Sequence, residues 1–221
     1  MIETENLTKI YNRGKPNEVQ AIIDANIVAA DGEITVFVGP SGCGKTTLMS
    51  LIGQLLSPST GRVLIDGQDI SAYSEHWKAV FRRENIGYIF QHINLLPNLN
   101  AVDNVLMPLL CHNVDIEKRR GPALVLLNDL GLGDRSYFKV ENLSGGEQQR
   151  VSVARALIAE PKIIIADEPL TFVDEASAKK ITDHLIQLRD EGKTILISTH
   201  VSNLARLGDK TISILNGKIQ N

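Results

Sequence analysis

The stretch that decides the fold runs Gly39-Pro40-Ser41-Gly42-Cys43-Gly44-Lys45-Thr46. It fits the pattern G-x-x-x-x-G-K-[ST], with a β-branched and apolar run before it (34–38) and helical spacing of apolar residues after it (46–56). Glycines let backbone N–H groups approach phosphate oxygens, and the helix N-terminus adds partial positive charge. Lys45 is suited to neutralise β- and γ-phosphates, and the Thr46 hydroxyl to bind Mg²⁺. This stretch, hereafter the phosphate loop, predicts a nucleotide-binding α/β fold; the plainer alternative is a glycine-rich turn with an incidental lysine.

An acidic strand end supplies the chemistry that the phosphate loop lacks. The apolar run 163–166 leads into Asp167 and Glu168, and open α/β sheets bind their ligands at the carboxyl ends of strands. Because consecutive strand side chains point to opposite faces, we expect the two acids to have different roles. We assign Asp167 to Mg²⁺, through a water or hydroxyl ligand, and Glu168 to polarising the attacking water. Alone, the pair would fit an acidic turn; together with the phosphate loop, it predicts hydrolysis.

A second glycine-rich element, Leu143-Ser144-Gly145-Gly146-Glu147-Gln148-Gln149-Arg150, precedes another helix. Ser144 is suited to cap that helix, and the two glycines expose backbone donors at its positive end. A plain helix N-cap would use the same residues. One nucleotide needs only one phosphate cradle, so the second element calls for a different explanation.

Short strands and inserted helices organise the rest of the chain. Runs rich in Ile and Val indicate strands at residues 2–10, 19–28, 34–38, 62–65, 86–90, 163–166 and 194–198, and a hairpin at 211–220 around Asn216-Gly217. Helical spacing covers residues 46–56, 102–110, 116–130, 146–159 and 174–191. Because helices at 102–159 interrupt the strands, we expect a helical subdomain inserted into a β-rich core.

Composition excludes several classes of protein. The chain has 221 residues, 43% of them hydrophobic, and a formal net charge of −3, so it lacks the basic excess of a nucleic-acid binder. No run approaches the ~20 apolar residues of a membrane-spanning helix, and the start MIETENLTKI lacks the pattern of a signal peptide. Two cysteines, Cys43 and Cys111, are too few for a disulfide framework. We therefore expect a cytosolic protein with no nucleic-acid partner.

The element LSGGEQQR (143–150), placed between the phosphate loop and the acidic strand, resembles the signature motif of ATP-binding cassette (ABC) ATPases. The resemblance covers essentially the whole chain. It implies an α/β fold: a P-loop NTPase core with a mixed sheet, an N-terminal antiparallel β subdomain and an inserted α-helical subdomain. It implies one ABC ATPase domain over residues 1–221, with 1–91 and 160–221 forming the core and β subdomain and about 92–159 forming the helical signature subdomain.

In that family the signature of one subunit faces the γ-phosphate held by the phosphate loop of the other, so the resemblance implies a head-to-tail pair around two ATP molecules. Tyr11 matches the aromatic that stacks on adenine, Gln91 the glutamine that reaches Mg²⁺ and the water, and His200 the histidine that contacts the γ-phosphate. Taken alone, such a Tyr or His would fit a structural role. The implied ATP contacts are Tyr11, Gly39, Pro40, Ser41, Gly42, Cys43, Gly44, Lys45, Thr46, Thr47, Ser144, Gly145, Gly146, Glu147 and Asp174; the implied Mg²⁺ ligands are Thr46, Gln91 and Asp167; the implied catalytic residues are Lys45, Gln91, Glu168 and His200.

Within the family, residues 91–97 and 99–105 are similar to the subgroup serving lipoprotein release, macrolide-type efflux and division-associated complexes. In those systems the transmembrane permease is a separate subunit, which implies a peripheral location on the inner face of the cell membrane. The apolar residues Ile93, Leu95, Leu96 and Leu99 are then expected near the groove that receives a coupling helix of the permease. Packing within the helical subdomain is the alternative for some of them.

Three positions depart from the family pattern. Leu170 and Phe172 are bulkier than the usual residues after the acidic strand, which bears on communication between the two ATP sites, and Cys43 stands where serine is more frequent. Other functions remain open: a soluble ABC ATPase of DNA repair, chromosome structure or translation, and a regulator that signals through a membrane partner without transport. The first usually carries an insertion or a second cassette that this chain lacks. A simple P-loop kinase would have no use for the signature.

Overall fold

Two sheets divide the strands of the protein. The computed structural model describes residues 1–112, 114–171, 173–200 and 202–220. In this part of the chain an antiparallel sheet has the order β2-β1-β4-β5, and a mixed sheet has the order β10-β9-β3-β8-β7-β6. Their bounds are β1 (Ile2–Tyr11), β2 (Val19–Ala29), β3 (Ile34–Val38), β4 (Thr60–Ile65), β5 (Gln68–Asp69), β6 (Ile86–Ile89), β7 (Ile163–Asp167), β8 (Thr194–Thr199), β9 (Lys210–Leu215) and β10 (Lys218–Gln220).

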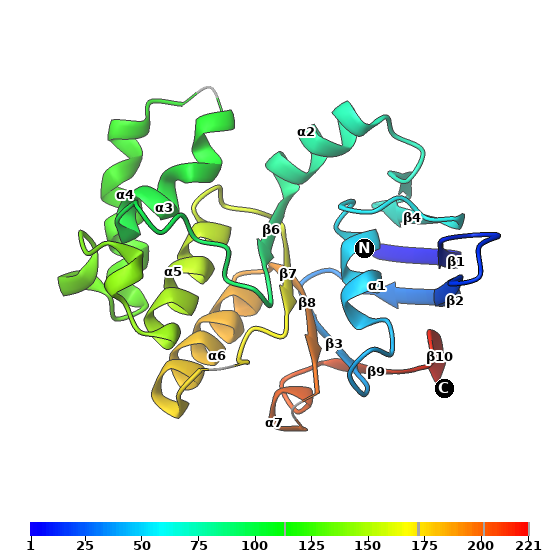
Figure 1. The fold of residues 1–221 in the computed structure, drawn as a ribbon. Coiled ribbons are helices and arrows are strands. Elements are labelled where there is room, and N and C mark those ends of the chain that lie inside the picture. The colour runs from blue at the N-terminus through cyan, green and yellow to red at the C-terminus, as the bar shows by residue number, and fades with distance from the viewer. Residues whose placement is uncertain (113, 172, 201, 221) are drawn as a thin grey trace.

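Helices cover both faces of the mixed sheet. Their bounds are α1 (Lys45–Ile52), α2 (Glu75–Asn85), α3 (Ala101–Leu106), α4 (Ile116–Asp129), α5 (Gly145–Leu157), α6 (Glu175–Asp190) and α7 (Ser202–Ala205), with 3₁₀ turns at Met107–Cys111, Gly133–Arg135 and Val140–Asn142. Figure 1 shows α3, α4 and α5 grouped on one side of the mixed sheet, whereas α1 lies between that sheet and β1, β2 and β4. This arrangement confirms the predicted fold class, because the helical group enters the chain between β6 and β7.

The central strands are covered on both faces. Neighbouring residues of β3 belong to different cores: Val36 packs with the helical group, and Phe37 packs with α1 and the antiparallel sheet. Ile164 and Ile165 of β7 divide in the same way. A strand buried on both faces needs apolar residues at every position, which explains why these strands read as continuous apolar runs without alternation.

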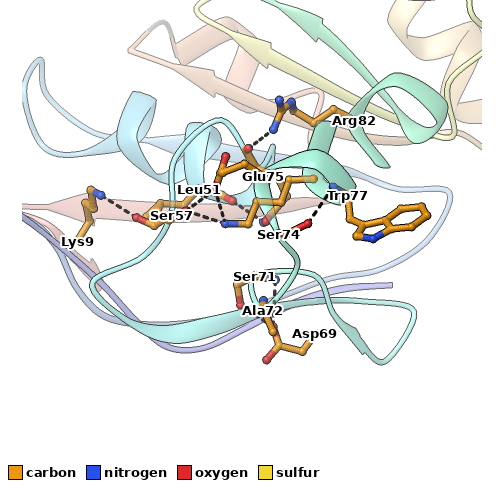
Figure 2. Close-up of polar contacts among 12 residues, drawn as sticks. Lys9, Leu51, Ser57, Asp69, Ser71, Ala72, Ser74, Glu75, Trp77 and Arg82 are labelled. Carbon is orange, nitrogen blue, oxygen red and sulfur yellow. Dashed lines mark hydrogen bonds and ion pairs between the residues drawn. The ribbon is translucent and has the colours of Figure 1, made fainter. Parts of the chain in front are cut away.

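Two helices differ from their predicted bounds by more than two residues, and two others, α2 and α7, were not predicted. The helix α1 ends at Ile52, not at residue 56, because Gly53 caps it and Gln54 adopts φ 57°. The helix predicted over 102–110 is α-helical only to Leu106 and continues as a 3₁₀ turn that contains Pro108, consistent with proline's lack of a backbone donor. The helix α2 was not predicted, although Trp77, Val80 and Phe81 have helical spacing. Its buried residue is Lys78, and Val80 and Phe81 are partly buried. Figure 2 shows the polar contacts of α2 with the segment after α1, where Nζ of Lys78 donates to Oγ of Ser57 at 2.6 Å.

The predicted hairpin around Asn216-Gly217 is formed by β9 and β10. Both turn residues have positive φ, 50° and 75°, as a tight two-residue hairpin requires. Among the described residues, no helix combines the length and the apolar character that crossing a membrane requires.

Candidate nucleotide-binding site

A cleft of 800 Å³ opens at the carboxyl ends of β3 and β7, beside the N-terminus of α1. Parallel pairing of β3 with β8, and of β8 with β7, brings the segments that follow these strands to one edge of the sheet. Nine of the predicted site residues line this cleft: Ser41, Gly42, Gly44, Lys45, Thr46, Thr47, Gln91, Glu168 and His200. The structure therefore brings together predicted residues from four separate segments of the chain.

Close backbone contacts hold the phosphate loop in place. Gly44, the N-cap residue of α1, has φ 111°, and a Cβ there would lie 2.4 Å from the carbonyl oxygen of Ala21 in β2. A Cβ on Gly39 would lie 2.3 Å from the carbonyl oxygen of Ile214 in β9. The buried Cys43 accepts a hydrogen bond on its carbonyl oxygen from the Gly217 N–H, at 2.9 Å. The loop is thus fixed between β2 and the β9–β10 hairpin, with no room for side chains at two of its glycines.

Lys45 is a buried cation at this cleft. Its side chain is 6% exposed, and Nζ donates to the carbonyl oxygens of Gly39 at 2.8 Å and Pro40 at 3.2 Å. Nζ also lies 3.5 Å from Oε1 of Glu168. A buried ammonium held by its own loop and facing one carboxylate is well placed to attract an anionic ligand.

The two neighbouring acids have different partners. Asp167, at the end of β7, is buried and accepts a hydrogen bond from the Ser198 hydroxyl of β8. Glu168 has φ 49°, and its N–H donates to the carbonyl oxygen of Ser198 at 3.1 Å. The carboxylate of Glu168 lies close to both Lys45 and His200. Nδ1 of His200 is 2.7 Å from Oε2 of Glu168. The left-handed backbone at Glu168 is a strained conformation of the kind that occurs at functional sites.

Tyr11 lies at the border of the cleft and does not line it. It ends β1 opposite Val19 of β2, and Val19 does line the cleft. Lys9 Nζ lies 5.4 Å from the centroid of the Tyr11 ring, within the range of a cation–π contact. Its predicted stacking on adenine remains a prediction.

The signature forms a capping box at the start of α5. The Ser144 hydroxyl accepts from the Glu147 N–H at 3.3 Å, and Oε2 of Glu147 accepts from the Ser144 N–H at 2.8 Å. This backbone hydrogen bond is the main cause that lowers the pKa of Glu147, with a further contribution from the Ser144 side chain. Ser144 and Gly145 are exposed, and neither lines the 800 Å³ cleft of the same chain.

Behind the signature, α5 packs tightly on the start of α6. A Cβ on Gly146 would lie 2.5 Å from Oδ2 of Asp174 and 2.8 Å from Oγ of Ser177. Asp174 caps α6 by accepting from the backbone and hydroxyl of Ser177, and the hydroxyl hydrogen bond is the main cause that lowers the pKa of Asp174. Arg150 donates to the same hydroxyl. Within one chain, Asp174 therefore serves the junction between the signature helix and α6.

The loop after the acidic strand is attached to the signature helix. Nε2 of Gln149 donates to the carbonyl oxygen of Pro169 at 3.0 Å, and Leu170 packs against the core of the helical group. The bulky Leu170 thus has a packing role. Phe172, the second bulky residue named above for this loop, lies outside the described residues.

Several residues of this site were not predicted from the sequence. Ser198 holds both Asp167 and the backbone of Glu168, and its position near the end of a β-branched strand gave no signal of that role. The cleft is also lined by Gln20, Ala21 and the turn Asn216-Gly217. The turn itself was predicted, but its contact with the phosphate loop depends on strand order and could not be read from the local pattern.

Comparison with known proteins agrees with this geometry. The family model described as ABC transporter matches residues 23–171. An uncharacterised ABC transporter ATP-binding protein of Methanocaldococcus jannaschii is 40% identical over 219 residues, 99% of this chain and 97% of that relative. The lipoprotein-releasing system ATP-binding protein LolD of Syntrophus aciditrophicus is 39% identical, with 99% of this chain and 98% of that relative covered.

A relative of different size and a solved structure extend the comparison. The macrolide export ATP-binding/permease protein MacB of Hyphomonas neptunium is 40% identical over 99% of this chain, which spans 34% of that longer protein. A dimeric ATP-binding cassette in a post-hydrolysis state, bound to ADP and Pi, superposes with a TM-score of 0.94 at 36% identity, covering 100% of this chain and 97% of that one. The chain therefore belongs to the ABC transporter family, as an ATP-binding subunit that hydrolyses ATP.

Proposed function

We propose that two copies of this cassette pair head to tail and hydrolyse two ATP molecules, each bound between the phosphate loop of one copy and the signature of the other. One observation carries this proposal: Lys45 and Glu168 meet in a cleft that the signature of the same chain does not line. The signature nevertheless presents an exposed helix N-terminus with Ser144 and Gly145. Each chain thus carries two anion-binding surfaces that are separate within the molecule.

ATP fits the cleft through the backbone of the phosphate loop. Gly42 and Gly44 adopt the left-handed conformation, which leaves the loop's N–H groups free of neighbouring Cβ atoms. Ser41, Lys45, Thr46 and Thr47 line the same cleft and are proposed to contact the phosphates together with Gly39, Pro40, Cys43 and the adenine-stacking Tyr11. Lys45 supplies the positive charge for the β- and γ-phosphates.

The chemistry of the donor set fits Mg²⁺. Thr46, Gln91 and Asp167 offer a hydroxyl, an amide oxygen and a carboxylate, which are the hard oxygen donors that Mg²⁺ prefers. Thr46 and Gln91 line the cleft, and Asp167 is held by Ser198 at the end of β7. When bound, Mg²⁺ neutralises charge that develops on the β- and γ-phosphate oxygens. A single carboxylate is enough for such a site, because the phosphates supply further oxygens.

We propose that Glu168 orients and polarises the attacking water and that His200, which lies beside Glu168, contacts the γ-phosphate. Its Nδ1, 2.7 Å from Oε2 of Glu168, fixes the orientation of the carboxylate. Gln91 lines the same cleft and is proposed to reach Mg²⁺ and the water and to relay the change to the membrane partner. In the second copy, Ser144, Gly145, Gly146 and Glu147 are proposed to close over that phosphate, with Asp174 supporting them from α6.

A complementation experiment tests the head-to-tail arrangement. A Lys45→Ala chain keeps its signature, and a Ser144→Ala chain keeps its phosphate loop; we expect each alone to hydrolyse ATP poorly. If the sites form between copies, a mixture of the two chains assembles one intact composite site, and ATP hydrolysis reappears. If the mixture shows only the sum of the two separate activities, the head-to-tail arrangement is wrong.

We further propose that the cassette acts on a separate transmembrane permease at the inner face of the cell membrane, as one domain whose residues 92–159 form the helical signature subdomain. The likeness to LolD over almost its whole length supports this proposal. Retention of a membrane subunit by the tagged chain from solubilised membranes is the direct test. If no membrane protein is retained, with or without ATP, the proposed permease is wrong.

A further inference from the structure

We propose that the hydroxyl of Thr171 is a further part of the hydrolytic site, and that it accepts one hydrogen of the attacking water while Glu168 accepts the other. The proposal rests on the proposed function, because it takes Glu168 as the group that polarises this water. It adds the second contact that the water needs. No motif of the sequence marked Thr171, which stands between Leu170 and Phe172.

The side-chain oxygen of Thr171 is buried and has no hydrogen-bond partner among the described residues. A buried hydroxyl without a partner costs free energy, so such a group calls for a water or a ligand. Seven side-chain atoms of the described residues share this condition, and only the atom of Thr171 belongs to a residue that lines the 800 Å³ cleft. This hydroxyl therefore lies where ATP and its attacking water are proposed to bind.

The neighbours of Thr171 in the cleft are the groups proposed to act on the γ-phosphate and the water. Lys45, Gln91, Glu168 and His200 line the same cleft. A tight turn joins Thr171 to Glu168, because the Thr171 N–H donates to the carbonyl oxygen of Glu168 at 3.1 Å. A turn of this kind keeps the Cα atoms of its first and last residues within about 7 Å. One water can therefore contact both side chains.

The carboxylate of Glu168 needs help to orient a water. Oε1 lies 3.5 Å from Nζ of Lys45, and Oε2 lies 2.7 Å from Nδ1 of His200. A single hydrogen bond to this carboxylate leaves a water free to rotate, whereas a second acceptor fixes the direction of its lone pair toward phosphorus. Because the amide oxygen of Gln91 is proposed to bind Mg²⁺, the Thr171 hydroxyl is the better candidate for the second acceptor.

The loop that carries Thr171 is anchored at the two preceding residues. The carbonyl oxygen of Pro169 accepts from Nε2 of the buried Gln149 at 3.0 Å, and Leu170 packs against the core of the helical group. Threonine is β-branched, so its side chain has few rotamers. The hydroxyl is thus held in place before ATP binds, as a group that orients a reacting water must be.

The two hydrogens of the water have different fates in the reaction. The water oxygen forms a bond to the γ-phosphorus, and the bond from that phosphorus to the β,γ-bridging oxygen breaks, with its electron pair leaving on ADP. The hydrogen that faces Glu168 passes to the carboxylate as a proton. The hydrogen that faces Thr171 stays on the water oxygen and becomes part of the inorganic phosphate. Thr171 therefore exchanges no proton and acts by orientation alone.

The first test compares two substitutions at this position. Thr171→Val keeps nearly the same shape without the hydroxyl, whereas Thr171→Ser keeps the hydroxyl. We expect Thr171→Val to lower ATP turnover about tenfold, and Thr171→Ser to stay within about twofold of the parent. The affinity for a non-hydrolysable ATP analogue, measured by calorimetry, should be unchanged in both. Parental turnover by Thr171→Val, or an equal loss of analogue affinity, would overturn the proposal.

Thr35→Val is the matched control. The side-chain oxygen of Thr35 in β3 is also buried without a hydrogen-bond partner in the described part of the chain, and Thr35 does not line the cleft. We expect this variant to hydrolyse ATP at the parental rate. A loss of turnover equal to that of Thr171→Val would attribute both effects to the fold and would contradict the role of Thr171.

A double substitution separates a role at the water from a role in the fold. In a Glu168→Gln chain the group that takes the proton is gone, so adding Thr171→Val should change the remaining turnover by less than about twofold. A further tenfold loss in this background would show that Thr171 acts independently of Glu168, against the proposal. Parental turnover by Glu168→Gln alone would instead contradict the proposed function.

Discussion

Oε2 of Glu168 lies 2.7 Å from Nδ1 of His200, although 32 positions separate the two residues in the chain. The parallel pairing of β7 with β8 creates this contact, because each residue follows the carboxyl end of its strand. The Glu168 side chain is 8% exposed, whereas that of His200 is 56% exposed. A buried carboxylate oriented by an accessible imidazole is a suitable group to activate a water at the mouth of the cleft.

Replacing Glu168 by Gln should lower ATP turnover by about a hundredfold or more, since general-base catalysis contributes factors of this size. Nucleotide binding should persist, because Lys45 and the phosphate loop are unchanged, and the ATP-bound dimer should accumulate in sizing chromatography. Glu191→Gln, an exposed change away from the cleft, is the control. Turnover at the parental rate by the Glu168 variant would show that another group activates the water.

Gly44→Ala should abolish high-affinity ATP binding, measured by calorimetry. The new Cβ would lie 2.4 Å from the Ala21 carbonyl oxygen, in addition to the strain of about 1–3 kcal/mol that a left-handed φ imposes on a non-glycine residue. Gly14→Ala is the control that separates backbone strain from steric overlap. Gly14 also has a positive φ, 77°, but a Cβ there would meet no atom of the described residues within 4 Å. ATP affinity retained by the Gly44 variant would mean that the loop tolerates displacement from β2.

Ser198→Ala should lower ATPase activity and raise the Mg²⁺ concentration needed for half-maximal rate. The substitution removes the hydroxyl that donates to Asp167 and accepts from the Glu168 N–H, leaving a buried carboxylate without that donor. Ser152→Ala is a matched control, because the buried Ser152 hydroxyl has no hydrogen-bond partner among the described residues. An unchanged Mg²⁺ dependence would argue that Ser198 does not position Asp167.

Gly146→Ala should separate hydrolysis from nucleotide binding. Its Cβ would lie 2.5 Å from Oδ2 of Asp174, so α5 must shift against α6, and a displacement of this order at a reacting site costs about a hundredfold in rate. Binding of ATP to the single chain should stay unchanged, because Gly146 does not line the cleft. The control is Gly121→Ala in α4, where a Cβ would have no neighbour within 4 Å in the described part of the chain. Equal losses of binding and turnover would contradict a role of the signature between copies.

The signature cap should make stability depend on acid pH. The folded protein lowers the pKa of Glu147 below its ordinary value of 4.5, so this group stabilises the fold above pH 4.5 and loses that effect as pH falls through the folded pKa. Asp174 acts in the same direction. In urea unfolding, Glu147→Ala should be less stable than the parent by about 1 kcal/mol at pH 7, and the difference should shrink at pH 3. A difference that grows on acidification would contradict the capping role.

Local sequence patterns were sufficient where one contiguous segment carries both the chemistry and its structural context. The phosphate loop, the acidic strand and the hairpin turn each combine a residue pattern with the backbone conformation it needs, and the fold class followed from their order. The helix α2 was not predicted: Trp77, Val80 and Phe81 have helical spacing, but they extend over little more than one turn, and the buried residue of the helix is the lysine Lys78.

The sequence by itself predicted a nucleotide-binding fold from residues 39–46, two acids at the end of a buried strand and a helix capped by the signature. Only the tertiary structure decided that Ser198 holds Asp167 and that the Asn216-Gly217 turn lines the cleft. The physical reason is strand order. Residues far apart in the chain meet through the pairing of β7 with β8 and of β3 with β8 and β9, which no local periodicity encodes.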